Sequence, residues 1–326
     1  MLAALALAAV LAAAATPVPR LAAPNQALRP GEPLEIQVHD NALIGEYAAP
    51  PDTARHPAVI VLGGIGGGIP GESFGFARQG YAALSVAYFG ADPLPKVIEM
   101  IPVERVSRAI DWLRDRPEVD PTRIGIVGIG KGSELALLAA ARDPRIKSVA
   151  VISPTAYVWF APKFDGNPDR SSWTVSNGEV PYIPIDSRAE NNLARASQTG
   201  GTYQFRDLYD ASLAAANAAT VSSATIPVER IAGPLLCVAG DDDREWDSAG
   251  ACKTIAARRR VANRDARDQV AIEAGAGHAL ALGGKPSPET VPAGKMTLRL
   301  GGNPAANAHA GADAWNRTLT FLAKTL

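Results

Sequence analysis

The chain has 326 residues, of which 47% are hydrophobic, and its formal charge is −1. This length and apolar content are ample for a buried core. The near-neutral charge gives no reason to expect nucleic acid or an anionic membrane surface as a partner.

The first residues have the composition of an export signal. Residues 2–15 are apolar and rich in alanine, and this stretch is shorter than the ~20 residues that a membrane-spanning helix needs. Its small residues suit the apolar region and cleavage site of a signal peptide, although the basic region is missing. We therefore expect residues 1–16 to be a signal peptide, residues 17–33 an irregular tail, and the chain to be exported with no stable membrane span. The alternative is an ordinary buried helix.

The chain has two cysteines, Cys237 and Cys252. An even number in an exported protein allows one disulfide. However, Cys237 lies in an apolar run where cysteine acts as a small hydrophobe. We favour two buried thiols, and a bridge remains the alternative.

Strand and helix patterns alternate along the rest of the chain. Residues 34–48 alternate in polarity before and after a turn, which predicts an antiparallel hairpin. The remaining expected strands are residues 58–64, 82–89, 123–129, 146–154, 234–240 and 269–275, and the expected helices are 71–80, 102–117, 133–142 and 310–326. This alternation predicts one α/β domain over residues 34–326, with a doubly wound, mostly parallel sheet.

Residues 155–230 interrupt this alternation. They are long, aromatic and polar, with few strand signals, and a long irregular insertion in a compact domain is usually functional. We expect a lid-like insertion above the carboxyl ends of the strands, where open α/β sheets bind ligands. Trp159, Phe160 and Trp173 are candidates to line a substrate pocket, although they fit packing of the lid on the body equally well.

The junction "VGIGKGSELAL" (127–137) reads as a strand, a turn and a helix. In many hydrolases this junction carries the motif G-x-S-x-G, with the central serine as nucleophile. Here the central residue is Gly130, which has no side chain to act as a nucleophile. Ser133 lies about one helical turn further on, and its better-supported role is in the first turn of the helix.

Two further strand ends carry an acid and a histidine. The run Asp241–Asp243 follows one strand and His278 follows the next, so the chain order is turn, acid, histidine, as in α/β-hydrolases. The segment "VLGGIGGG" (61–68) supplies backbone N–H groups where an oxyanion hole is built. We expect the amides of Ile65 and Lys131 to form it. Each feature alone is weak, because acidic turns, lone histidines and glycine-rich turns are common.

Several ordered segments resemble one enzyme family. They include "PAVIVLGGIGGG", "GIVGIGKGSELAL", "IPVERIAGPLLCVAGDDDREWDSA", "GAGHAL" and "LGGNPAANAHAGADAWNRTLTFL". Together they resemble the catalytic domain of the bile acid-CoA:amino acid N-acyltransferase / acyl-CoA thioesterase family, a branch of the α/β-hydrolases related to dienelactone hydrolases. The resemblance implies that Asp243 is the catalytic acid, His278 the catalytic histidine, and Gly130 the position of the nucleophile.

The expected function is that of an acyl hydrolase or acyltransferase whose activity is lost or much reduced at Gly130. A binding protein that keeps the pocket for a small acyl ligand is the alternative, and hydrolysis by water that His278 and Asp243 activate is a weaker one. We expect no cofactor and no metal. An exported chain does not meet intracellular CoA thioesters, so the substrate is left as a thioester, ester or amide. The sequence does not decide the oligomeric state.

Overall fold

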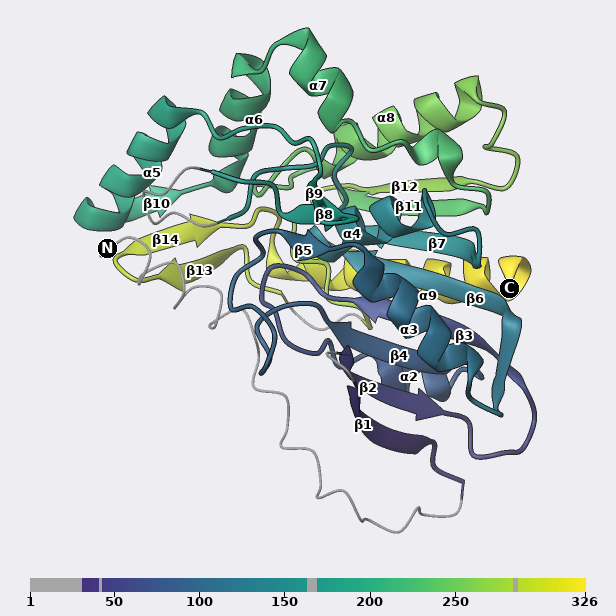
Figure 1. Ribbon diagram of the computed structural model, residues 1–326. Helices are drawn as coiled ribbons and strands as arrows, with labels where there is room; N and C mark the ends of the chain where they lie inside the picture. Colours follow the sequence, from purple (N-terminus) through teal and green to yellow (C-terminus); the bar gives the residue numbers. More distant parts are fainter. Residues whose placement is uncertain (1–30, 41–42, 163–168, 284–286) are drawn as a thin grey trace.

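The structure is a computed structural model that describes residues 31–40, 43–162, 169–283 and 287–326. The expected signal peptide, and the expected tail up to residue 30, lie outside the described residues. An eight-stranded sheet forms the centre, in the order β1-β2-β4-β3-β6-β7-β11-β12 (Figure 1). β1, β2 and β4 pair antiparallel, and the pairs from β4 to β12 are parallel. The predicted doubly wound, mostly parallel sheet is therefore confirmed.

The predicted hairpin and strands are all present in this sheet. The strands are β1 (Leu34–Asp40), β2 (Leu43–Ala49), β3 (His56–Leu62), β4 (Ala82–Ala87), β6 (Val119–Ile129), β7 (Ile146–Ile152), β11 (Leu235–Gly240) and β12 (Gln269–Glu273). Short strands form two further sheets: β5 (Ile101–Pro102), β8 (Trp173–Val175) and β9 (Gly178–Glu179) in one, and β10 (Gly201–Tyr203), β13 (Thr290–Ala293) and β14 (Met296–Arg299) in the other.

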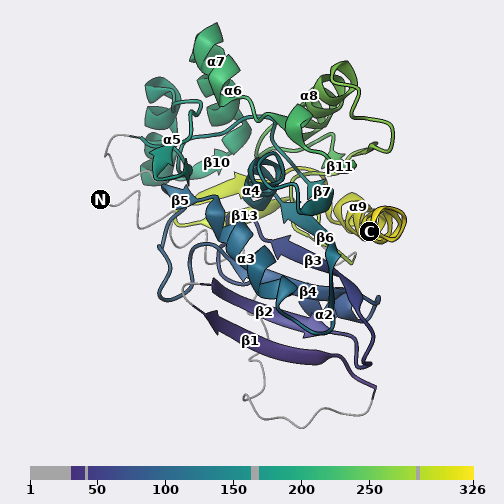
Figure 2. The same ribbon diagram turned by 45° about the vertical axis from the view of Figure 1, so that its right-hand side comes forward.

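Helices cover both faces of the large sheet. They are α2 (Ser73–Ala77), α3 (Glu104–Arg114), α4 (Lys131–Ala140), α8 (Ser248–Val261) and α9 (Pro304–Thr325). Side chains of α3, α4 and α8 pack with Ile60 and Ile126, whereas those of α2 and α9 pack with Val59 and Val127. Neighbouring residues of a strand point to opposite faces, so the apolar runs of β3 and β6 supply both core layers. Figure 2 shows the same sheet and its helices from a second direction.

The insertion is more helical than its sequence indicated. It contains α5 (Ser187–Thr199), α6 (Phe205–Ala215), α7 (Ala218–Ala224) and the 3₁₀ turn η1 (Val228–Arg230). The side chains of Asp186 and Asn217 accept hydrogen bonds from Ala189 N and Thr220 N at the starts of α5 and α7, the usual way in which Asx residues begin a helix. The irregular reading was wrong because short capped helices rich in alanine lack a long apolar period.

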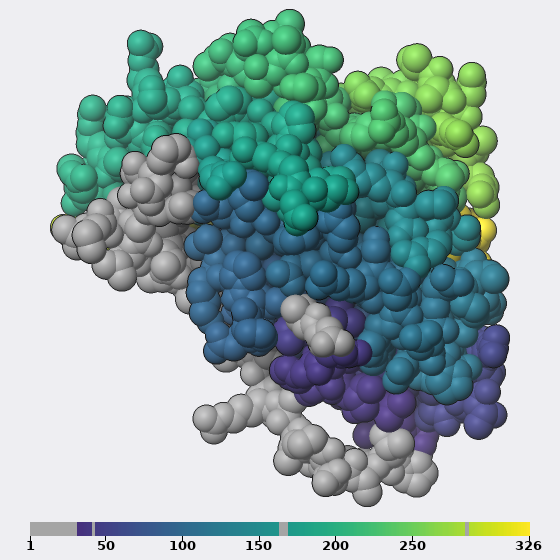
Figure 3. All heavy atoms as spheres, viewed as in Figure 1, coloured from purple at the N-terminus to yellow at the C-terminus, as the bar shows by residue number. Residues whose placement is uncertain are grey.

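The insertion has an apolar core of its own. Its side chains pack with those of β13 and β14, and with Trp246 from the loop after β11. It forms the upper, teal-to-green part of the surface in Figure 3, and Tyr209 of α6 contacts Trp246 with ring centroids 5.4 Å apart. The insertion therefore reaches the loop that carries Asp243.

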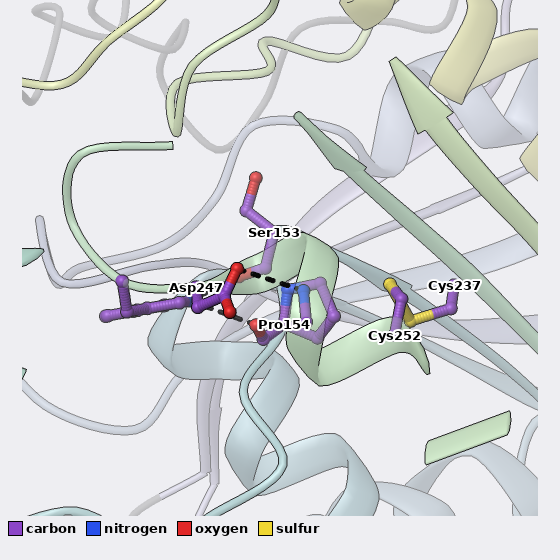
Figure 4. Close-up of a disulfide and its surroundings, with 7 residues drawn as sticks. Ser153, Pro154, Cys237, Asp247 and Cys252 are labelled. Atoms are coloured by element: carbon purple, nitrogen blue, oxygen red, sulfur yellow. Dashed lines mark hydrogen bonds between the residues drawn. A yellow bond between two sulfur atoms is a disulfide. The ribbon is translucent and has the colours of Figure 1, made fainter. Parts of the chain in front are cut away.

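The two cysteines are joined in a disulfide, so the preference for free thiols was wrong. Cys237 in β11 and Cys252 in α8 have Cα atoms 5.7 Å apart (Figure 4), a distance that suits a bridge. Asp247 accepts a hydrogen bond from Gly250 N at 3.0 Å and so caps the start of α8. The first turns of α8 bring Cys252 against Cys237 of β11. The spacing of the two cysteines in the sequence does not reveal this contact.

Across the described ranges, no helix combines the length and the apolar character that crossing a membrane requires.

Candidate active site

Gly130 lies at the sharp turn between β6 and α4. Its backbone angles are φ 53° and ψ −119°, a region that side-chain-bearing residues enter at a cost of order 1–3 kcal/mol. Gly130 N donates to Ile152 O, and Ser133 donates to Gly130 O through both its amide and its hydroxyl. Ser133 is thus used in the first turn of α4, as its place in the sequence indicated.

The glycines beside this turn allow close backbone contacts. A Cβ atom on Gly132 would lie 2.4 Å from Gly63 O, and one on Gly128 would lie 2.6 Å from Gly132 O. Both distances are too short for any larger residue. The turn therefore keeps the geometry of a strand–turn–helix elbow, in which the central glycine is the least restricted of the three glycines: a Cβ atom there would meet no atom closer than 3.2 Å.

Asp243 and His278 meet at the carboxyl edge of the sheet. Asp243 Oδ2 lies 2.9 Å from His278 Nδ1. Asp243 Oδ1 accepts hydrogen bonds from the amides of Glu245 and Trp246 at 2.8 and 3.2 Å, which fixes the carboxylate. The Trp246 ring packs edge-on against the imidazole, with centroids 4.6 Å apart. The two residues that the sequence proposed as acid and histidine are therefore in contact.

Gly130 lies on the other side of the imidazole. A Cβ built on Gly130 would be 3.2 Å from His278 Nε2 and 3.7 Å from Gly64 Cα. A hydroxyl or thiol at this position would thus start beside the ring nitrogen that faces away from Asp243. The sequence-based order of turn, acid and histidine corresponds to one cluster in space.

The same ring nitrogen already has a partner that the sequence analysis did not single out. Glu245 Oε2 lies 3.2 Å from His278 Nε2, and the carboxyl of Glu245 is buried. Burial alone would lower the pKa of His278, but the carboxylates of Asp243 and Glu245 outweigh it and raise this pKa to about 9. Burial also raises the pKa of Glu245, against the opposing effect of His278.

The two expected oxyanion-hole amides have no partner in the part of the chain that the structure describes. Ile65 lies in the turn after β3, and its N–H donates to no described residue. Lys131 is the first residue of α4, and the first N–H groups of a helix lack intrahelical acceptors. Neither amide is engaged by a described residue, and their joint role in an oxyanion hole stays a prediction.

The expected pocket residues are packed inside the protein. Glu134 Oε1 accepts hydrogen bonds from Trp159 N at 3.0 Å and Trp173 Nε1 at 2.6 Å, while its Oε2 binds Lys131 Nζ at 2.7 Å. Phe160 stacks on Tyr209. These contacts fit packing of the insertion on the body, and the pocket-lining role stays a prediction.

Three residues near the site carry no signal in the sequence beyond their position. Glu245 is one; Ser153, at the end of β7, is another, and donates from its hydroxyl to His278 O at 2.7 Å. Asn307 accepts from Gly277 N at 2.8 Å. Together, Ser153 and Asn307 hold the loop that presents the histidine.

Two cavities of about 320 and 330 Å³ lie elsewhere, and neither is lined by Gly130, Asp243 or His278.

Comparison with known proteins identifies the family of the chain. The family model for the C-terminal part of BAAT / acyl-CoA thioester hydrolases matches residues 101–326. Mouse mitochondrial acyl-coenzyme A thioesterase 2 is 29% identical over 300 residues, covering 89% of this chain and 60% of that protein. Mouse acyl-coenzyme A thioesterase 1 is also 29% identical, covering 89% and 65%. The chain thus spans less than two thirds of the length of these relatives.

Solved structures show the same fold at low identity. A dienelactone hydrolase-like promiscuous phosphotriesterase from metagenomic libraries has a TM-score of 0.51 at 15% identity, covering 90% of this chain and 98% of its own. A puromycin-hydrolyzing peptidase of Mycobacterium tuberculosis has a TM-score of 0.53 at 14% identity, covering 91% and 39%. The chain has the α/β-hydrolase fold and belongs to the BAAT / acyl-CoA thioester hydrolase family.

Proposed function

We propose that this chain keeps the acyl-binding site of its family but performs no acyl transfer through position 130. The observation that carries the proposal is the place of Gly130: a side chain there would begin 3.2 Å from Nε2 of a histidine that Asp243 holds from the other side. That is where the nucleophile of a serine or cysteine hydrolase belongs. A glycine supplies no oxygen or sulfur, so no acyl-enzyme forms.

The remaining parts have defined roles in this proposal. Asp243 orients the imidazole of His278 through Nδ1. The amides of Ile65 and Lys131 donate to the carbonyl oxygen of a bound acyl group. Since these groups recognise a carbonyl without breaking a bond, the site binds an acyl compound.

Hydrolysis by activated water is the weaker alternative. It requires His278 Nε2 to accept a proton from water. In the structure this nitrogen faces the carboxyl of Glu245 at 3.2 Å, which favours the protonated ring. The contact supports the binding function over the activated-water reaction.

The acyl ligand is a thioester, ester or amide. The named relatives are acyl-coenzyme A thioesterases, which supports an acyl thioester. The disulfide between Cys237 and Cys252 supports export, because structural disulfides persist in oxidising compartments. An exported chain would meet acyl compounds other than CoA thioesters.

Ester hydrolysis tests the proposal. Hydrolysis of p-nitrophenyl esters is measured for the native chain, for His278→Ala, for Gly130→Ser and for Gly130→Ser combined with His278→Ala, from pH 6 to 10. We expect turnover only with the single serine substitution, rising as the pH approaches 9. Saturable, His278-dependent hydrolysis by the native chain would contradict the proposal and support activated water.

A further inference from the structure

One imidazole lies between two carboxyl groups at the candidate site. Asp243 faces His278 Nδ1 at 2.9 Å, and Glu245 faces Nε2 at 3.2 Å. In a serine or cysteine hydrolase, the second nitrogen faces the nucleophile and receives its proton. Here the residue at the nucleophile position is a glycine, and a carboxyl group is the partner of that nitrogen instead.

A hydrogen bond in the loop after β11 fixes the backbone of Glu245 relative to Asp243. Asp243 Oδ1 accepts a hydrogen bond from the backbone N–H of Glu245 at 2.8 Å. The same aspartate therefore fixes both the imidazole and the residue that contacts its far side. Glu245 is only 5% exposed, so water competes little for its carboxyl group.

The other charged and titratable groups around the site have partners of their own or stay neutral, so none of them takes the place of the ion pair between Glu245 and His278. Lys131 of α4 is fully buried and bonds to Glu134 at 2.7 Å. Arg206 of α6 donates to Asp243 O and pairs with Asp210 and Asp247. Burial and nearby carboxylates raise the pKa of Tyr209 well above its usual value, so this group stays neutral. Among the described residues, His278 is the direct ion-pair partner of Glu245.

We propose that Glu245 is a positioning residue that takes the place of the missing hydroxyl or thiol as the partner of His278 Nε2, through an ion pair at 3.2 Å, and holds the ring as an imidazolium at neutral pH. An imidazolium has no lone pair with which to accept a proton. The chain then differs from an active hydrolase in two respects: Gly130 supplies no nucleophile, and His278, although present, is protonated and cannot act as a base. The catalytic consequence rests on the function proposed above, whereas the protonation state of His278 can be measured independently.

NMR titration of the four histidines measures that state directly. Long-range ¹⁵N–¹H correlations are recorded on the full chain, and His278→Ala identifies the His278 signals. We expect His278 to remain doubly protonated through neutral pH and to titrate near pH 9. Glu245→Gln, or Glu245→Ala if the first does not fold, should lower its midpoint by at least one pH unit.

Glu229→Gln is the matched control, because Glu229 pairs with Arg258, away from His278, and should leave the midpoint unchanged. A native midpoint near the ordinary value of about 6.5, or one that removal of Glu245 does not move, would overturn the proposal.

A kinetic comparison separates this proposal from the proposed function. Ester hydrolysis by Gly130→Ser is compared with that by Gly130→Ser combined with Glu245→Gln. The double variant should be about tenfold faster at pH 7, since each unit of pKa changes the unprotonated fraction tenfold, and the two rates should converge above pH 9. Equal rates at pH 7 would contradict the role of Glu245. If both variants are inactive, the proposed function fails, while the NMR result still decides the role of Glu245.

Discussion

The central residue of the candidate site is His278, and its environment differs from that of a free general base. The ring is held by Asp243, packed by Trp246 and faced by Glu245. Its pKa is raised to about 9, since the two carboxylates outweigh the effect of burial. Protonation of this ring should therefore affect both the chemistry and the stability of the protein.

We predict that the protein becomes less stable as the pH rises from about 6.5 to 9. The folded pKa of His278 lies above the unfolded value, so the native state binds more protons in this window and its advantage is lost as the pH passes the folded pKa. The loss is at most ~1.4 kcal/mol per pH unit, about 3 kcal/mol in total. Urea unfolding at pH 6.5 and pH 9 measures it.

The double variant Glu245→Gln with His278→Gln is the control for this prediction, because it removes the coupled pair. Its stability should vary much less across the same window. A difference between pH 6.5 and pH 9 as large as that of the native chain would show that other groups are responsible.

At the scale of elements, α4 carries a buried ion pair beside the strand–turn–helix elbow. Lys131 and Glu134 are both fully buried, and Glu134 also binds Trp159 and Trp173 of the insertion. This helix therefore links the elbow to the insertion. The two charges of the pair depend on each other, because an unpaired charge buried inside a protein lowers the stability of the fold.

We predict that Glu134→Ala destabilises the protein by about 3–5 kcal/mol, because it leaves the Lys131 charge buried and unpaired. Lys131→Met combined with Glu134→Gln should recover part of this loss. Urea unfolding at pH 7 is measured for Glu134→Ala, for the single variants Lys131→Met and Glu134→Gln, and for their combination. Losses that simply add would show that the two charges are not coupled.

The second link between elements is the disulfide that joins β11 to α8. The two cysteines are 15 residues apart, and closing a loop of that size stabilises a protein by about 3 kcal/mol. We predict that dithiothreitol lowers the free energy of unfolding of the native chain by about 2–4 kcal/mol. Cys237→Ala with Cys252→Ala should be indifferent to the reductant. If the native chain does not respond either, the thiols are not bridged.

At the scale of the whole molecule, the sequence was sufficient where function depends on topology. Gly130, Asp243 and His278 each follow a strand in the parallel part of one sheet, and the carboxyl ends of parallel strands lie at one edge. Their meeting was therefore predictable from chain order. The core on both faces of the sheet was also predictable, because continuous apolar runs indicate strands that are buried on both faces.

Features that depend on the direction of one side chain were not predictable. The disulfide depends on how α8 returns to β11, and the contact of Glu245 depends on the turn that Asp243 fixes. Two helices of the insertion, α5 and α7, begin at single capping side chains, Asp186 and Asn217, and such short signals were not recognised in the sequence. The expected signal peptide lies outside the described residues and stays a prediction.

The central claim, that position 130 is the place of a missing nucleophile, is tested most directly by covalent labelling. The native chain, Gly130→Ser and Gly130→Ser with His278→Ala are treated with a fluorophosphonate probe at pH 9, and the adduct is located by peptide mass spectrometry. We predict that only the single serine variant is labelled, on the peptide containing position 130, because His278 can accept its proton. Labelling of the native chain at another residue, such as Ser133, or no labelling of a folded Gly130→Ser variant, would contradict the account.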